Sequence, residues 1–193
     1  MTRDTALRWW PAIGLPALVL LGLLVGRGST PLDDRFLRFG DTHPNAYVLL
    51  LCTDARLLVL LYLVAGAIAL FGRRWRLAAV ALVTPVVAVA VVRMLKLAFG
   101  RDKGGALAYP SGHVTVTVVV LGLLVLTLGA RLWMFVVASV HALLGLLGQA
   151  ISYHYFTDTV GALLLGTAAL CLAVRAAGLD RCQPRCDPRH IVG

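Results

Sequence analysis

A Ser-Gly-His triplet at residues 111–113 brings together residue types that bind anions and transfer protons. It stands immediately before an apolar run, 114–128, that could form a buried helix. In a helix that begins here, the backbone N–H groups of Gly112 and His113 would lack partners, and the positive end of the helix dipole would lie beside them. Ser111 would add a hydroxyl. The triplet therefore predicts an anion site, although an ordinary helix start with Ser111 as N-cap explains it equally well.

His154 and Asp158 form a second candidate group. They are four residues apart, so on a helix they share a face, and the carboxylate can hold one imidazole N–H. Such a pair fixes the tautomer and leaves the other ring nitrogen free to act as a base or nucleophile. With His113 nearby, one imidazole could act as a nucleophile while the other protonates the leaving group. The alternative is a structural histidine at the membrane interface beside a carboxylate.

Three cations, Lys96, Arg101 and Lys103, precede the triplet in the sequence. Positive side chains beside a helix N-terminus suit a multiply charged oxyanion and would stabilise the charge that develops in phosphoryl transfer. All nine acidic residues are Asp, and none of them forms a cluster that would hold a divalent ion. We therefore expect neither a metal nor a cofactor.

The composition indicates that these residues are positioned by membrane helices. Of the 193 residues, 60% are hydrophobic and only 14% are charged, against roughly 25% in soluble domains. Several apolar runs approach the roughly 20 residues that a spanning helix needs. We predict an all-α, polytopic membrane protein in which residues 1–178 form one domain of six transmembrane helices. The predicted spans are about 10–26, 46–71, 76–99, 111–128, 132–149 and 155–177.

Three features between and within these spans allow more than one interpretation. Residues 30–45 have the spacing of a short amphipathic helix lying in the membrane interface, or they form a plain loop. Asp54 and Arg56 lie inside the second span if the whole run is helical, where ionisable residues suggest function. If that helix begins near Leu57, they lie only at its mouth. His141, inside the fifth span, suits a hydrogen bond between helices better than catalysis.

The arginines predict the orientation in the membrane. Six spans place both termini on one side, and most arginines fall on that side, which the positive-inside rule makes cytoplasmic. The outer face of the plasma membrane then carries the candidate site residues Lys96, Arg101, Lys103, Ser111, His113, His154 and Asp158. Membrane anchoring also accounts for the net charge of +9, and no basic stretch with interleaved aromatics suggests nucleic acid. The arginines on the cytoplasmic side are Arg3, Arg8, Arg73, Arg74, Arg76, Arg131, Arg175, Arg181, Arg185 and Arg189.

Residues 179–193 form a basic tail that we expect to be cytoplasmic and flexible. Cys182, Cys186 and His190 could be three metal ligands, but their spacing is irregular and no fourth ligand is evident. A flexible basic tail is the default interpretation.

The three stretches resemble the signature of the phosphatidic acid phosphatase type 2 superfamily, which includes membrane lipid phosphatases and soluble haloperoxidases. The signature is Lys-x6-Arg-Pro, then Pro-Ser-Gly-His, then Ser-Arg-x5-His-x3-Asp. Residues 110–113 match the second block in full. The first block keeps Lys96, has Lys103 in place of arginine and Gly104 in place of proline, and Arg101 fits a Gly-Arg pair common in members.

The third block keeps the histidine and the aspartate but has Leu147-Gly148 where Ser-Arg is expected. The resemblance implies that His154 is a nucleophile that forms a phosphohistidine, that Asp158 orients it, and that His113 is the acid for the leaving group. It also implies that Lys96, Lys103, Ser111 and Gly112 hold the phosphate.

The resemblance further implies a metal-independent phosphatase acting on a lipid phosphate at the outer membrane face. We favour a polyprenyl phosphate or diphosphate carrier of the undecaprenyl or decaprenyl type, used in cell-envelope biosynthesis. The alternatives are a phosphatase for phosphatidylglycerol phosphate or another phospholipid, a lipid phosphotransferase, and a catalytically impaired homologue that binds lipid or acts as a scaffold. The sequence does not predict an oligomeric state.

Two departures from the signature affect the phosphate site. Lysine at position 103 loses the bidentate geometry of arginine, and Gly148 supplies no cation. Arg56 and Arg93 are available in the outer halves of their spans. Our hypothesis is that one of them replaces the missing guanidinium.

Overall fold

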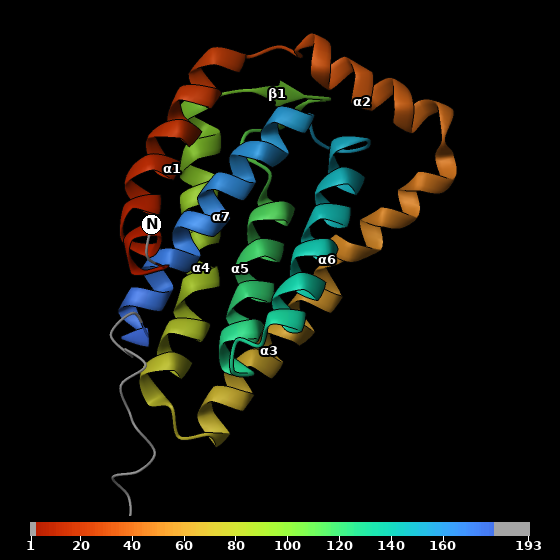
Figure 1. Ribbon diagram of the computed structural model, residues 1–193. Coiled ribbons are helices and arrows are strands. Elements are labelled where there is room, and N and C mark those ends of the chain that lie inside the picture. Colours follow the sequence, from red (N-terminus) through yellow and green to blue (C-terminus); the bar gives the residue numbers. More distant parts are fainter. Residues whose placement is uncertain (1–2, 180–193) are drawn as a thin grey trace, which may run out of the picture.

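The computed structural model describes residues 3–179, so most of the predicted tail, with Cys182, Cys186 and His190, lies outside the described residues. Within this range the chain forms seven α-helices, one 3-10 helix and a two-stranded hairpin (Figure 1). The all-α prediction is confirmed. The elements are α1 (Arg3–Val25), α2 (Pro31–Thr42), η1 (Pro44–Thr53), α3 (Ala55–Phe71), α4 (Trp75–Phe99), β1 (Asp102–Lys103), β2 (Ala106–Leu107), α5 (Gly112–Thr127), α6 (Leu132–Ala150) and α7 (Phe156–Ala176).

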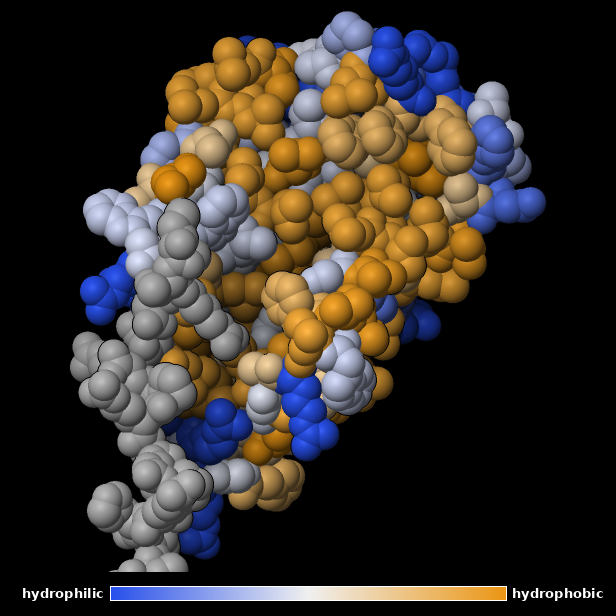
Figure 2. Space-filling view, in the orientation of Figure 1, coloured by the Kyte–Doolittle hydropathy of each residue, from blue (hydrophilic) through white to orange (hydrophobic). Residues whose placement is uncertain are grey.

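Five helical segments among the described residues are long and apolar enough to cross a membrane, which indicates a membrane protein. The surfaces of these segments that face away from the bundle carry large apolar side chains, such as Leu24, Phe71 and Leu132, each more than 75% exposed. Figure 2 shows this apolar surface over most of one face of the bundle. Such a surface suits lipid rather than water. The five segments are Leu7–Val25, Pro44–Phe71, Trp75–Phe99, Leu132–Ala150 and Phe156–Ala176.

The fourth predicted span, 111–128, corresponds to α5, which has 16 residues and is shorter than the five segments above. The six-span topology therefore stays a prediction. The α5 helix packs against α3, α4, α6 and α7, and most of its side chains are buried. The hydroxyls of Thr115 and Thr117 donate to the carbonyl oxygens four residues earlier, both at 2.8 Å, so neither is left without a partner inside the bundle.

Glycines let α5 and α7 approach closely. A Cβ at Gly122 would lie 2.3 Å from Leu170 Cδ1, and one at Gly166 would lie 2.9 Å from Val118 Cβ. Neither position has room for a larger residue without movement of its neighbour. These contacts hold the middle and C-terminal parts of α5 and α7 together.

The segment between α1 and α3 contains two helices. In α2 the hydroxyl of Thr30 accepts from the backbone N–H of Asp33, whose carboxylate accepts in turn from the backbone N–H of Thr30. The predicted helix in residues 30–45 is therefore present, although its place relative to a membrane stays a prediction.

Residues 46–71 do not form one continuous α-helix, in contrast to the predicted second span. The 3-10 helix η1 ends at Thr53, and Asp54 caps α3 by accepting hydrogen bonds from the backbone N–H groups of Arg56 and Leu57. Aspartate favours such a cap because its short side chain reaches the unpaired donors of the first turn. Asp54 and Arg56 are exposed at the start of α3, as in the second of the two interpretations above.

The 3-10 helix η1 packs along α6. A ring nitrogen of His141 lies 2.9 Å from the carbonyl oxygen of Cys52, and the amide of Gln149 donates to the Thr53 hydroxyl at 2.7 Å. A Cβ at Gly145 would lie 2.7 Å from Thr53 Cγ2. His141 thus joins two segments by a hydrogen bond, the role preferred for it from the sequence.

The two ends of the bundle differ in chemistry. The hairpin and the starts of α5 and α7 lie at one end, and the α3–α4 turn lies at the other (Figure 1). At the latter end, Arg74 donates to the Thr127 carbonyl at 3.0 Å and Arg76 donates to the Ala176 carbonyl at 2.8 Å. The candidate histidines are therefore separated from the arginine-rich turns by the length of the bundle.

Candidate functional site

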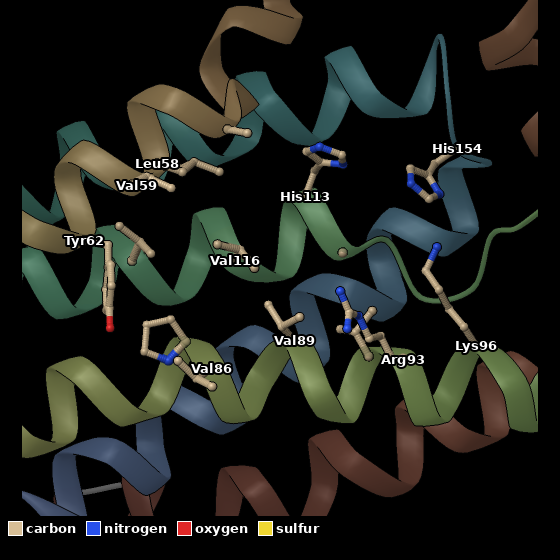
Figure 3. A pocket seen from close by; sticks show the side chains of 15 residues that line it. Leu58, Val59, Tyr62, Val86, Val89, Arg93, Lys96, His113, Val116 and His154 are labelled. Atoms are coloured by element: carbon tan, nitrogen blue, oxygen red, sulfur yellow. The ribbon is translucent and has the colours of Figure 1, made fainter.

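A cavity of about 580 Å³ lies between α3, α4 and α5 and contains several of the candidate residues. Figure 3 shows Lys96 and Arg93 projecting from α4 toward the end of the cavity where His113 and His154 lie, while aliphatic side chains line its other end. Chain segments more than 60 residues apart thus contribute to one cavity. Its polar members are Tyr62, Arg93, Lys96, His113 and His154, and the backbone of Gly112 adds to them.

His154 lies in the turn between α6 and α7 rather than on α7 itself. Its backbone N–H donates to the Gln149 carbonyl at 2.9 Å, which holds this turn against the end of α6. Its Nδ1 lies 3.7 Å from Asp158 Oδ2, too far for a hydrogen bond, and this buried nitrogen has no partner. The expected pair is therefore present as a near contact from turn to helix, not as a shared helix face.

Asp158 is fully buried in the first turn of α7. Its Oδ2 accepts from the backbone N–H of Tyr155 at 3.0 Å, and its Oδ1 accepts from Arg101 Nη1 at 2.6 Å. Its main-chain carbonyl accepts from the backbone N–H of Ser111 at 3.2 Å. Asp158 thus joins the start of α7 to the start of α5.

Ser111 occupies the N-cap position of α5 but does not act as a side-chain cap. Its Oγ is buried and has no hydrogen-bond partner. A buried hydroxyl without a partner is costly, so this atom is available for a further hydrogen bond, although Ser111 itself does not line the cavity. Gly112 and the exposed His113 follow in the first turn, where backbone N–H groups and the helix dipole favour an anion.

Lys96 and Lys103 differ in their contacts and in their position relative to the cavity. Lys96 lines the cavity, and its Nζ donates to the Leu107 carbonyl of the hairpin. Lys103 lies outside the cavity lining, and its Nζ donates to the carbonyl oxygens of Ser152 at 2.7 Å and His154 at 3.0 Å. Burial lowers the pKa of Lys103, against the opposing effect of nearby carboxylates, chiefly Asp158. Lys103 therefore stabilises the turn that contains His154.

Arg101 differs most from its expected role in substrate binding. Its side chain is fully buried, and hydrogen bonds account for all five of its N–H donors. It forms ion pairs with Asp33 at 2.8 Å and with Asp158 at 2.6 Å. The remaining bonds go to the Gly28 carbonyl, at 3.1 and 2.8 Å, and to the Thr157 hydroxyl, at 2.6 Å. In this arrangement Arg101 has no donor left for a substrate.

Arg56 and Arg93, the two arginines considered as replacements for the one missing at Gly148, lie in different places. Arg93 lines the cavity beside the histidines, whereas Arg56 is exposed at the start of α3 and does not line it. At Gly148 a Cβ would lie 2.7 Å from the Leu49 backbone carbon, because η1 crosses α6 there. The position where the family signature has arginine therefore has no room for a side chain.

Sequence reasoning missed Asp33 and Thr157. Asp33 is fully buried, and it accepts hydrogen bonds from Arg101 and from both the backbone N–H and the hydroxyl of Thr157. The only local signal at Asp33 is the capping box with Thr30, which predicts a helix start but not a partner 68 residues later in the chain.

Among residues 3–179, no three His, Cys, Asp or Glu side chains lie close enough together to hold a metal ion. The candidate ligands of the tail fall outside that range.

Comparisons with known families, curated proteins and solved structures give no match to this chain.

Proposed function

We propose that this protein is a membrane lipid phosphatase that hydrolyses a polyprenyl phosphate or diphosphate through a phosphohistidine at His154. The proposal combines the resemblance to the phosphatidic acid phosphatase type 2 superfamily with the contents of the cavity. We further propose that the reaction needs no metal ion, as the resemblance implies, and that the substrate is a lipid carrier used in cell-envelope biosynthesis.

The main support for the proposal is the two-part cavity. One end contains cationic and histidine side chains, and the other end is an apolar groove. Lys96, Arg93, His113 and His154 gather at the first end, and valines from three helices line the second (Figure 3). Val59 and Val86 are more than half exposed, so the groove opens at the lipid-facing surface. An amphiphile with a phosphate head and an apolar chain matches both parts.

The reaction would proceed in two steps. His154 Nε2 attacks the terminal phosphorus, and the bond from that phosphorus to the leaving oxygen breaks while His113 gives its proton to that oxygen. The leaving oxygen is the lipid oxygen of a monophosphate or the bridging oxygen of a diphosphate. Water then attacks the phosphohistidine, His113 takes the water proton, and inorganic phosphate leaves. Asp158 stabilises the charge on His154. Transfer of the phosphoryl group to another acceptor instead of water would give the phosphotransferase alternative.

The phosphate oxygens would be held by groups at the start of α5 and by cations of α4. Ser111 Oγ and the backbone N–H of Gly112 provide hydrogen-bond donors, and Lys96 and Arg93 provide positive charge. Arg93 would supply the guanidinium that Gly148 lacks. Lys103 would act on His154 through the backbone rather than on the phosphate.

The proposed orientation places this site at the outer face of the plasma membrane, with both termini in the cytoplasm. Arg73, Arg74, Arg76 and Arg131 belong to the turns at the opposite end of the bundle, which supports this orientation under the positive-inside rule.

A non-catalytic lipid-binding protein is the second candidate. Its support is that Arg101 and Lys103 are both engaged with protein groups and that position 148 carries no side chain. Such a protein would keep the fold and the groove without turnover.

Release of inorganic phosphate from a panel of lipid phosphates distinguishes the two candidates. The panel contains polyprenyl phosphate and diphosphate, phosphatidylglycerol phosphate and phosphatidic acid, each with and without EDTA. The phosphatase predicts release in EDTA that is lost in His154→Ala and retained in His43→Ala, an exposed histidine beyond α2. No release from any substrate, with lipid binding retained, would support the non-catalytic candidate instead.

A further inference from the structure

Three charged side chains, Asp33, Arg101 and Asp158, meet in the protein interior with no solvent exposure. They come from α2, the β1 side of the hairpin and α7. Buried charges are stable only when they are paired and hydrogen-bonded, and each of these is. The cluster lies behind the cavity, next to His154 but not in the cavity lining.

Arg101 is the centre of this cluster. Its Nη1 bonds to Asp158 Oδ1 at 2.6 Å and its Nη2 bonds to Asp33 Oδ2 at 2.8 Å. The planar guanidinium therefore fixes the two carboxylates in one geometry. Asp158 Oδ2 is left facing His154 Nδ1 at 3.7 Å.

Asp33 holds the other side of Arg101. Its Oδ1 accepts from the backbone N–H and the hydroxyl of Thr157, at 2.9 and 3.0 Å. Its Oδ2 accepts from Arg101 Nη2 and from the backbone N–H of Thr30, at 2.8 and 2.9 Å. Burial would raise the pKa of Asp33, but these hydrogen bonds outweigh it and the pKa is lowered. Both oxygens of the Asp33 carboxylate accept hydrogen bonds. An asparagine here would therefore place its NH₂ group against N–H donors in either orientation of the amide.

We infer that Asp33 and Arg101 are positioning residues that hold the Asp158 carboxylate against His154, and that Arg101 does not bind the substrate. The inference rests on the proposed function of His154. It also assigns a role to the α1–α2 segment, because Asp33 and the Gly28 carbonyl in that segment both bind Arg101.

The first test is kinetic and uses full-length protein in detergent. Asp33→Asn is expected to lower kcat about 100-fold with little change in KM, because small displacements of reacting groups cost about that much while the substrate contacts remain. The matched control is Asp34→Asn, on the same turn of α2, whose carboxylate takes no part in the cluster. Arg101→Lys is expected to retain more activity than Arg101→Gln, because it keeps the charge.

A double variant separates positioning from a general loss of structure. If Asp33 acts through Asp158, adding Asp33→Asn to Asp158→Asn causes no further loss of kcat, whereas independent effects would multiply. Full additivity, or wild-type kcat in Asp33→Asn, would overturn the inference.

The second test does not require activity. The ¹⁵N resonances of the His154 ring, identified by their loss in His154→Ala, report which nitrogen carries the proton. Wild type and Asp34→Asn are expected to carry it on Nδ1, facing Asp158, and this preference is expected to be lost in Asp33→Asn and Asp158→Asn. An unchanged tautomer in Asp33→Asn would refute positioning. If the wild type releases no phosphate, the proposed function fails while this second test still decides whether Asp33 positions Asp158.

Discussion

Arg93 is the one arginine in the described chain whose side chain lines the cavity. Replacing it with alanine removes a charge-assisted contact with the phosphate, which is worth about 1.5–3 kcal/mol. We expect kcat/KM for the lipid phosphate to fall about 10- to 100-fold. Arg56→Ala is the matched control, because Arg56 is exposed outside the cavity and its loss should leave kcat/KM unchanged. Equal effects of the two variants in the phosphate-release assay would refute this assignment.

The sequence predicted which candidate residues lie near one another better than it predicted their contacts. Residue spacing and the alternation of spans were enough to bring Lys96, Gly112, His113 and His154 to one cavity. They could not predict that Arg101 is buried, because that depends on a carboxylate in α2 far away in the sequence. A motif specifies residue order, whereas burial depends on which helices pack together.

Among the elements, the crossing of η1 and α6 determines what position 148 can hold. The Cβ of Gly148→Ala would lie 2.7 Å from the backbone carbon of Leu49, so backbone would have to move. We expect a loss of about 1–3 kcal/mol in stability, measured by thermal unfolding in detergent. Gly14→Ala is the control, because its Cβ would meet its neighbours at 3.5 Å or more within α1. A Gly148→Ala protein as stable as Gly14→Ala would show that η1 does not pack there.

The same crossing explains why arginine cannot simply be restored at position 148. The sequence showed only that the residue was missing. It did not indicate that η1 fills the space, because residues 46–71 were predicted as one straight span. The apolar composition of η1 gave no sign of its 3-10 geometry. The position of Asp54 at the mouth of a helix was one of two open interpretations, but its capping role was not predicted.

For the whole molecule, the proposed function requires that the lipid chain occupy the groove between α3 and α4. Val86→Trp adds bulk inside this groove, whereas the neighbouring Val87 is similarly exposed but does not line it. We expect Val86→Trp to raise KM for a long-chain lipid phosphate about tenfold or more, because buried apolar area is lost. Val87→Trp should leave it unchanged. Neither variant should affect hydrolysis of a small water-soluble phosphate ester, and an equal loss with both kinds of substrate would contradict a chain-binding groove.

The most direct test of the central claim is to look for the covalent intermediate. Wild-type protein is mixed with lipid phosphate labelled in the phosphoryl group, in EDTA, and quenched rapidly in base, in which phosphohistidine survives. The account predicts label on the protein that is released by acid, maps to the peptide containing His154, and is absent from His154→Ala, which also has no turnover. Turnover that persists in His154→Ala, or label that maps to another residue, would contradict it.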